Sequence, residues 1–399
     1  MSPAGPDPER VARALVDYAN ELHHAPPNRL PELVERTCRL LGGEDADIRL
    51  INLAQQHLVS LGSHTNPLDV EGTLAGRAYR TGETTLQTDG PRLRLWIPLL
   101  DSSERMGVLG VTVASDEDEL STGAGEMWSA LGCLVGQAIM SMAGYGDDIA
   151  LTRGMSNTTL AAEMRWGQLP PLTYWTPEVT VSGILEPAYE IAGDTFDYAV
   201  GGTTVQVAVL DAMGHGLEAS RMANMAVVAY RHARRHGRSI HDMLSDVDEV
   251  ISTEYGNHRF VTGQLATLDI HDGTLQIVNA GHPLPLHFRA GRYIGPVECS
   301  PSRPLGLGQV ETHVTETSLE PGDAVLFFTD GVTESRHPTG EELGEEWLAD
   351  LMSRQLRSGL SSPEALRLVV RALYDRAGPA LHDDATMVLI RWAGSAEQQ

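Results

Sequence analysis

The sequence predicts an α+β protein with two domains and a helical segment between them. Its 399 residues favour more than one domain. Residues up to about 145 alternate helical and strand patterns, whereas the chain beyond about 175 is rich in strand patterns with long helices between them. We therefore predict domains at 1–145 and 175–393, joined by a helical linker at 146–174.

The N-terminal domain is expected to begin with helices and to contain a sheet. Residues 9–22 and 30–41 have the apolar spacing of amphipathic helices. A short helix with glycines at both ends is expected within residues 71–83. Strand patterns, the last of them rich in valine, cover residues 47–53, 94–100 and 106–114.

An uncharged helix is expected to close this domain. Residues 127–146 are long enough to span a bilayer, and Gly132 and Gly136 form a small-residue helix-contact pattern. The large apolar side chains nevertheless follow one stripe, with polar residues such as Gln137 opposite. We therefore predict a packing or dimerisation helix rather than a membrane span, and a homodimer formed through the helices of this domain and the linker.

The charge balance limits the possible partners. The chain has 54 acidic and 29 basic residues, a net charge of -25 at pH 7, and its basic residues are all arginine. Such a chain is repelled by nucleic-acid phosphates and anionic lipids, so we expect no nucleic acid and no membrane as a partner. Without lysine there is no Walker-A, protein-kinase or Schiff-base lysine, which excludes those enzyme classes.

The cysteines and the N-terminus predict a cytoplasmic protein. Cys38, Cys133 and Cys299 lie far apart and form neither a CxxC pair nor a zinc-binding spacing. We expect them to be reduced, buried thiols. No basic segment followed by an apolar stretch marks a signal peptide.

The linker and the second domain have their own helix and strand patterns. Residues 158–164 continue a helical pattern that Pro170 and Pro171 must stop, and both a signal-carrying rod and a plain spacer fit this segment. Residues 217–235 form a long amphipathic helix. Strands are expected at 179–185, 204–210, 265–270, 274–278, 325–329 and 387–392, with a hairpin turn at 271–273.

Four aspartates stand at strand ends or turns beside glycine or another aspartate, namely Asp194, Asp211, Asp330 and Asp383. A carboxylate that follows buried apolar residues is costly unless it meets a cation or hydrogen-bond donors. Converging carboxylates also repel one another, and two divalent cations would offset four of them. Oxygen ligands without histidine or cysteine favour hard ions, so we expect two Mn²⁺ or Mg²⁺ ions, which activate water and bind phosphoryl oxygens.

The N-terminal pattern resembles a GAF domain. The resemblance rests on GTLAGRAYRTGE followed by LRLWIPLLDSSERMGVLGVTV, and it covers residues from about 28 to 143. The Asn-Lys-Phe-Asp-Glu signature of cyclic-nucleotide-binding GAF domains is absent, so cyclic nucleotide binding is not expected. The resemblance implies a sensory or dimerising α/β domain that controls the part of the chain after it.

The second half resembles the metal-dependent protein phosphatases (PPM), in the bacterial branch of SpoIIE-like and RsbU-like enzymes. The matching segments follow the family's order between about 165 and 392: LEPAYEIAGDTFDYAV, VAVLDAMGHGLEAS, VNAGHPLPLHF, LFFTDGVTESR and HDDATMVLIRW. The resemblance implies an αββα sandwich, two stacked β-sheets flanked by helices, with the metals at one end. It assigns the metal ligands to Asp194, Asp211 as the bridge between both ions, the carbonyl of Ala212, Asp330, and Asp383 or in its place Asp384.

Asp194, Asp211 and His215 are the expected catalytic residues. The role of His215 has two possible interpretations. Its imidazole could protonate the leaving serine oxygen. In eukaryotic members a histidine stands two residues after the bridging aspartate, where this chain has Met213. The alternative is therefore that His215 packs at the start of the following helix.

Five further positions bear on the predicted site. His282, in NAGHPLP, is expected in a turn near the metals, and Asp197 either supports the metal shell or lies at the surface. Glu190 precedes IAGD, so the phosphate-binding arginine of eukaryotic members has no obvious counterpart. Gly193 and Gly331 are expected to allow close approach of the backbone.

The resemblance implies a serine/threonine phosphoprotein phosphatase under control of the GAF domain. In this branch the usual substrate is a phosphorylated STAS-domain anti-anti-sigma factor, whose dephosphorylation releases a sigma factor from its anti-sigma kinase. The alternative is a signalling scaffold whose phosphatase-like domain binds partners without turnover.

Overall fold

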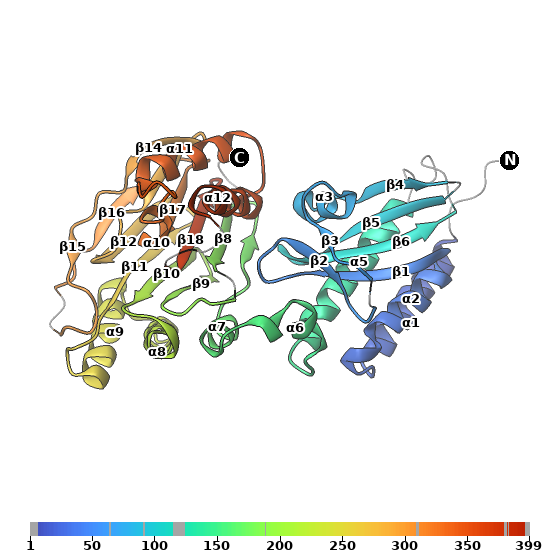
Figure 1. Ribbon diagram of the computed structural model, residues 1–399, viewed down its shortest axis with the longest axis horizontal. Helices are drawn as coiled ribbons and strands as arrows, with labels where there is room; N and C mark the ends of the chain where they lie inside the picture. Colours follow the sequence, from blue (N-terminus) through green and yellow to red (C-terminus); the bar gives the residue numbers. More distant parts are fainter. Residues whose placement is uncertain are drawn as a thin grey trace. The chain divides into compact units, whose positions relative to one another are not determined.

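The computed structural model describes residues 7–63, 65–90, 92–114, 124–187, 189–308, 311–378, 381 and 383–395. The chain divides into two compact units, Met1–Asn157 and Thr158–Gln399. Each unit contains a β-structure with hydrophobic cores of its own (Figure 1). The division falls inside residues 146–174, the segment expected to be a linker.

The first unit is built on a six-stranded antiparallel sheet with the strand order β3-β2-β1-β6-β5-β4. The near-continuous apolar run of β6 predicts a strand covered on both faces, and almost all of its residues are buried. The strands are β1 (Gly43–Ile51), β2 (His57–Ser60), β3 (Leu68–Asp69), β4 (Thr85–Asp89), β5 (Arg92–Asp101) and β6 (Glu104–Val113).

Helices cover both faces of this sheet. The buried side chains of α1, α2 and α5 share one core with the sheet, and α3 covers the other face. Thr73 caps α3 through its hydroxyl, and Gly82 ends that helix in the left-handed conformation, which explains the glycine-flanked pattern of the sequence. The helices are α1 (Pro8–Leu22), η1 (Pro27–Arg29), α2 (Leu30–Leu40), α3 (Leu74–Thr81), α5 (Gly125–Met142), α6 (Asp148–Thr152) and η3 (Met155–Asn157).

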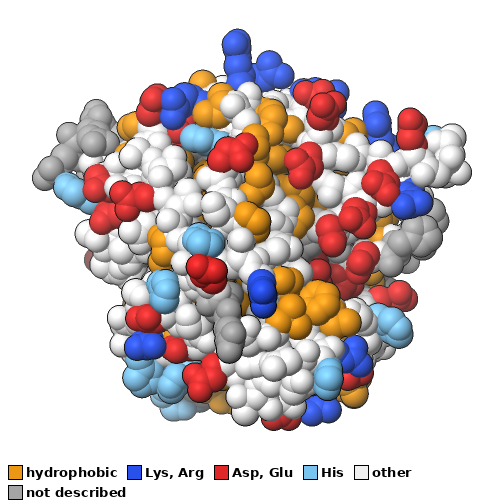
Figure 2. Space-filling view, turned by 90° about the vertical axis from the view of Figure 1, so that its left-hand side faces the viewer, with side chains coloured by type: hydrophobic (Ala, Val, Ile, Leu, Met, Phe, Trp, Pro, Cys, Tyr) orange, Lys and Arg blue, Asp and Glu red, His pale blue; other side chains and the backbone are white. Residues whose placement is uncertain are grey.

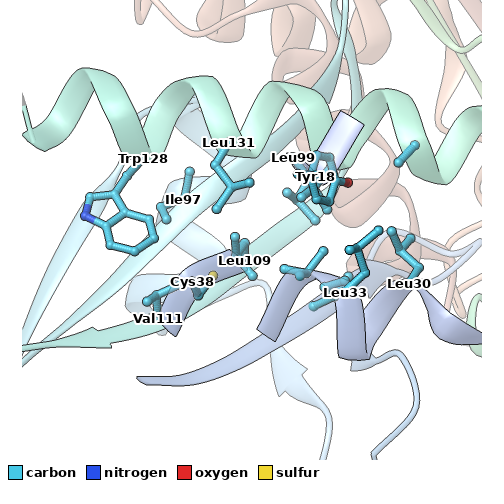
Figure 3. Close-up of a cluster of buried hydrophobic side chains, with 14 of the residues drawn as sticks. Tyr18, Leu30, Leu33, Cys38, Ile97, Leu99, Leu109, Val111, Trp128 and Leu131 are labelled. Atoms are coloured by element: carbon cyan, nitrogen blue, oxygen red, sulfur yellow. The ribbon is translucent and has the colours of Figure 1, made fainter. Parts of the chain in front are cut away.

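The uncharged helix α5 packs against the sheet of its own unit. Figure 3 shows Trp128 and Leu131 of α5 pointing toward Leu109 and the other side chains of this core. A Cβ atom at Gly136 would lie 2.4 Å from the carbonyl oxygen of Leu100 in β5. The small-residue pattern that suggested a helix–helix contact therefore allows a close helix–sheet contact.

The structure bears on the possibility that α5 spans a membrane. Among the described residues, no helix has both the length and the apolarity needed to cross a bilayer.

The three cysteines differ in their exposure. Cys38 and Cys299 are buried free thiols, but Cys133 is exposed. The prediction that Cys133 is buried was therefore wrong, because this residue occupies the side of α5 that faces away from the core.

The second unit is a sandwich of two sheets. One sheet has the order β15-β12-β11-β10-β9, with β16 also paired to β12, and the other has the order β14-β13-β17-β18-β8-β7. The strands are β7 (Thr173–Trp175), β8 (Val179–Glu186), β9 (Asp194–Gly201), β10 (Thr204–Ala212), β11 (Val261–Asp269), β12 (Thr274–Ala280), β13 (Leu286–Arg289), β14 (Arg292–Pro296), β15 (Pro301–Ser302), β16 (Thr315–Ser318), β17 (Ala324–Phe328) and β18 (Ala385–Trp392).

Helices flank both outer faces of the sandwich, which gives the αββα layers that the resemblance implied (Figure 1). One core lies between the sheets, a second lies under α8 and α9, and a third lies under α11 and α12. The helices are α7 (Leu160–Trp166), α8 (Gly216–Arg235), α9 (Ile240–Tyr255), α10 (Asp330–Thr333), α11 (Gly344–Arg357) and α12 (Ser362–Ala377).

Replacing Gly136 by valine should destabilise the first unit by about 1 to 3 kcal/mol, because the new side chain meets the backbone of β5. The matched control is Ser129→Val, an exposed position on the same helix. Urea unfolding followed by circular dichroism measures both variants. Equal stability of the two would contradict the packing described for α5.

Candidate metal centre

Two of the predicted aspartates face each other across neighbouring strands. Asp194 of β9 and Asp211 of β10 are directly opposed residues of an antiparallel pair, and Thr262 of β11 is opposed to Asp211 on the other side. Opposed residues of such a pair have Cβ atoms about 4.5–5.5 Å apart, and like charges at these positions are destabilising. The sheet register therefore brings two carboxylates together at the end of the sandwich.

Asp194 is almost completely buried, with 2% of its surface exposed. The hydroxyl of Thr329, at the end of β17, donates a hydrogen bond of 2.6 Å to Oδ2 of Asp194, which links the two sheets. Burial, followed by the charges of Asp211 and Asp384, raises the pKa of Asp194 well above its usual value, and the hydrogen bond from Thr329 opposes this shift. An ionised Asp194 is therefore unstable unless further positive charge lies nearby.

Asp211 lies among the other carboxylates of the site. Burial, with the charges of Asp330, Asp383 and Asp384, raises the pKa of Asp211 from 3.8 to about 7. A hydrogen bond with the side chain of Thr262 lowers this pKa and so favours the charged form. The carboxylates named from the sequence therefore act on one another electrostatically.

Thr262 in turn contacts His282 of the NAGHPLP segment, which was expected near the site. The Oγ1 atom of Thr262 lies 3.0 Å from Nδ1 of His282, within hydrogen-bond distance. Burial lowers the pKa of His282 to about 4, so the imidazole is neutral at physiological pH. His282 therefore supports Asp211 through Thr262, a role that the sequence motif alone did not reveal.

Asp383 and Asp384 differ in their surroundings. Oδ2 of Asp384 accepts backbone hydrogen bonds from Ala192, Gly193 and Asp194 at 2.8, 2.8 and 3.3 Å. Asp383 is exposed, and its charge contributes to the raised pKa of Asp330, after the larger effect of burial. The carboxylate of Asp384 thus fixes the turn that precedes β9. The carboxylate of Asp383 lies near Asp330 and, among the described residues, is free of such backbone hydrogen bonds to that turn.

Close backbone contacts hold these segments together. A Cβ atom at Gly331 would lie 1.9 Å from the carbonyl oxygen of Asp384, and one at Gly193 would lie 2.6 Å from that of Ala212. No other residue type fits at these distances without movement of the backbone. The close approach expected at both glycines is confirmed.

Two further candidates, His215 and Asp197, have surroundings of their own. His215 is the N-cap residue of α8, but its side chain is exposed and makes no capping hydrogen bond. Asp197 is buried and forms ion pairs with Arg231 and Arg234 at 2.6 and 2.8 Å. The reading of Asp197 as a surface acid was wrong, because these arginines hold it against α8.

The donor set fits hard divalent cations. It consists of carboxylates and backbone carbonyl oxygens, which Mg²⁺ and Mn²⁺ prefer, and the mutual repulsion of the carboxylates gives a cation a strong electrostatic advantage. Within the described ranges, no three His, Cys, Asp or Glu side chains are arranged closely enough to hold an ion as they stand. An ion here would therefore need water or backbone oxygen in addition to one or two carboxylates, as is common for Mg²⁺.

The comparison with protein families agrees with this geometry. Residues 201–393 match the family model for stage II sporulation protein E (SpoIIE). The second unit therefore contains a domain similar to the SpoIIE family, and the match covers slightly less than half of the chain. The match includes Asp211, Asp330 and Asp383, whereas Asp194 lies before its first residue.

Two curated relatives match a little more than half of the chain. Protein IcfG of Synechocystis sp. is 24% identical in an alignment of 252 positions that covers 56% of this chain and 38% of that protein. Phosphoserine phosphatase RsbU of Bacillus subtilis is 24% identical over 213 residues, 53% of this chain and 62% of RsbU. The aligned part therefore spans less than two thirds of either relative.

Two solved structures of similar fold each cover a little more than half of the chain. The RsbU and RsbW domains of a Mycobacterium tuberculosis protein share 26% identity at a TM-score of 0.47, covering 56% of this chain and 63% of that one. The SiaA-PP2C domain of Pseudomonas aeruginosa shares 22% identity at a TM-score of 0.48, covering 53% and 85%.

In metal-free protein, Asp211→Asn should raise the free energy of unfolding at pH 8 by about 2 to 4 kcal/mol, because it removes a repelled buried charge. Since folding raises the pKa of Asp211, the free energy of unfolding of the wild type should increase as the pH falls from above 7 to about 4. The difference in stability between Asp211→Asn and the wild type should therefore shrink over this range. Urea unfolding with a chelator at several pH values tests this, with Asp350→Asn on the exposed side of α11 as control. If Asp211→Asn were less stable than the wild type at pH 8, repulsion between Asp211 and the neighbouring carboxylates would be refuted.

Proposed function

We propose that the protein is a metal-dependent phosphatase that hydrolyses phosphoserine or phosphothreonine on a regulatory protein. The observation that carries the proposal is the clustering of carboxylates at one end of the sandwich: the charge of Asp211 raises the pKa of Asp194, and the charges of Asp330 and Asp383 raise the pKa of Asp211, in each case after the larger effect of burial. The match of residues 201–393 to the SpoIIE family and the similarity to a phosphoserine phosphatase support it.

Some residues of this site would bind the metal ions directly, and others would hold those ligands in place. Asp194, Asp211, Asp330, Asp383 and the carbonyl of Ala212 would hold two Mn²⁺ or Mg²⁺ ions. Bound cations of this kind supply an activated water and neutralise charge on the phosphoryl oxygens. Asp384 would serve as a support, because its Oδ2 atom already accepts three backbone hydrogen bonds.

The exposure of His215 to solvent supports a role for this residue in contact with substrate. Its side chain is exposed at the start of α8, four residues after Asp211. A general acid that protonates a leaving serine oxygen must be accessible from the substrate side. We therefore retain His215 as the candidate acid.

A phosphorylated STAS-domain anti-anti-sigma factor is the proposed substrate. The relative RsbU is named a phosphoserine phosphatase, and one of the similar structures joins an RsbU domain to an RsbW domain. On the face drawn in Figure 2, arginines lie singly or in small groups among carboxylates and apolar side chains. That pattern suits a protein partner better than a nucleic acid, which requires a continuous basic patch.

The first unit is proposed to be a GAF-like regulatory and dimerising domain. Its glycine-flanked helix and the β5–β6 hairpin occur in the order on which the resemblance rests. The outward side of α5, with Cys133 and Gln137 exposed and uncharged, is the surface proposed for contact with a second copy.

Full-length protein with Mn²⁺ should release phosphate from a phosphoserine STAS protein, and Asp211→Asn should reduce kcat by at least about a thousandfold. Asp350→Asn should have wild-type activity. Phosphate release measured under saturating Mn²⁺ provides the readout. A folded wild type without turnover at any Mn²⁺ concentration would favour the signalling scaffold instead.

Substitutions at Asp383 and Asp384 should show which of the two binds metal and which holds the backbone of the turn. Asp383→Asn should weaken Mn²⁺ binding at least tenfold with little change in stability, because it removes a charged donor from an exposed position. Asp384→Asn should be tolerated better than Asp384→Ala, since an amide oxygen still accepts from the backbone. Calorimetric Mn²⁺ titration and thermal unfolding measure both effects. The reverse pattern would make Asp384 the ligand.

A further inference from the structure

A buried arginine lies beside the carboxylate site and has no part in the function described so far. Arg165, on α7, has 0% of its surface exposed, which is rare for this residue type. Its Nη2 atom donates to the carbonyl oxygen of Ser220 in α8 at 3.0 Å. Its Nε and Nη1 atoms have no hydrogen-bond partner within the described part of the chain.

The charges that act on Arg165 are those of the site. Burial lowers the pKa of Arg165 to about 10, and the charges of Asp194 and Asp384 oppose this shift. A buried arginine with unsatisfied N–H groups is strongly unfavourable unless opposite charge offsets it. Asp194 and Asp384 provide that opposite charge, and Arg165 relieves part of their mutual repulsion.

Hydrogen bonds attach the helix that carries Arg165 to α8 and to the segment before β9. The hydroxyl of Ser220 donates to the carbonyl oxygen of Ala161 at 3.1 Å, which fixes α7 against α8. The backbone N–H of Thr159 donates to the carbonyl oxygen of Tyr189 at 2.9 Å, just before the turn that binds Asp384. Arg165 is therefore held in one place relative to that turn.

We propose that Arg165 is a positioning residue of the metal centre. From α7 its guanidinium group offsets the charge of Asp194 and Asp384 and thereby fixes the 192–194 turn and the carboxylate of Asp194 for metal binding. This inference rests on the proposed function, and it extends the site into residues 158–166, which the sequence assigned to a linker. Arg165 itself does not contact the substrate, because it is wholly buried.

The alternative is that Arg165 only joins α7 to α8 through its hydrogen bond to Ser220. Two substitutions separate charge from hydrogen bonding. Arg165→Lys keeps the charge and a donor, whereas Arg165→Gln keeps a donor and loses the charge. Arg165→Met loses both. A matched control is Arg367→Gln on α12, a buried arginine of the same unit that is paired with Glu364.

The test is calorimetric titration of the full-length variants with MnCl₂, together with kcat and KM for phosphate release. We expect Arg165→Lys to bind Mn²⁺ within about threefold of wild type, and Arg165→Gln and Arg165→Met to bind at least tenfold more weakly. Arg367→Gln should bind as the wild type does, and KM at saturating Mn²⁺ should remain unchanged in all variants.

Wild-type Mn²⁺ affinity in Arg165→Gln, or equal loss in Arg165→Lys and Arg165→Gln, would overturn the positioning role. A wild type that neither binds Mn²⁺ nor releases phosphate would instead contradict the proposed function. If the neutral Arg165 variants do not fold, the double variant Arg165→Met with Asp384→Asn decides. It should regain the fold, because opposite buried charges are removed together, and its failure to fold would also overturn the proposal.

Discussion

The opposition of Asp194 and Asp211 across two antiparallel strands is the constraint on which the second unit depends. A β-sheet register that places two carboxylates face to face is unfavourable by itself, and burial makes it more so. Neighbouring segments offset part of this effect, through the hydroxyls of Thr262 and Thr329 on either side of the pair. The remaining negative charge is what would bind cations in the proposed metal centre.

The fold concentrates this charge where its two sheets meet. Asp194 belongs to one sheet and its partner Thr329 ends a strand of the other, while Asp384 precedes β18 and binds the turn before β9. Gly331 permits the contact between these segments, since any side chain there would collide with the backbone of Asp384. The site therefore connects the two sheets. In the proposed function it would also bind metal, so that carboxylates needed for activity lower the stability of the fold.

The sequence predicted the elements whose patterns are local. Apolar runs that end in Asp-Gly or Asp-Ala marked β10 and β17, and the apolar stripe of residues 217–235 marked α8. The helix α9 was missed although Ser239 and Gly256 cap it, because its apolar positions are diluted by acidic residues. The distinction between Asp383 and Asp384 and the approach of Arg165 could not be predicted, since both depend on contacts between segments far apart in sequence.

Anomalous diffraction from crystals of the full-length protein grown with MnCl₂ would test the central claim most directly. Manganese peaks should lie between Asp211 and its neighbours Asp194, Asp330 and Asp383, with the oxygen atoms of Asp384 still bound to the backbone of the 192–194 turn. The absence of manganese peaks in this region at saturating Mn²⁺ would contradict the account. Manganese bound elsewhere, with these four aspartates far apart, would contradict it as well.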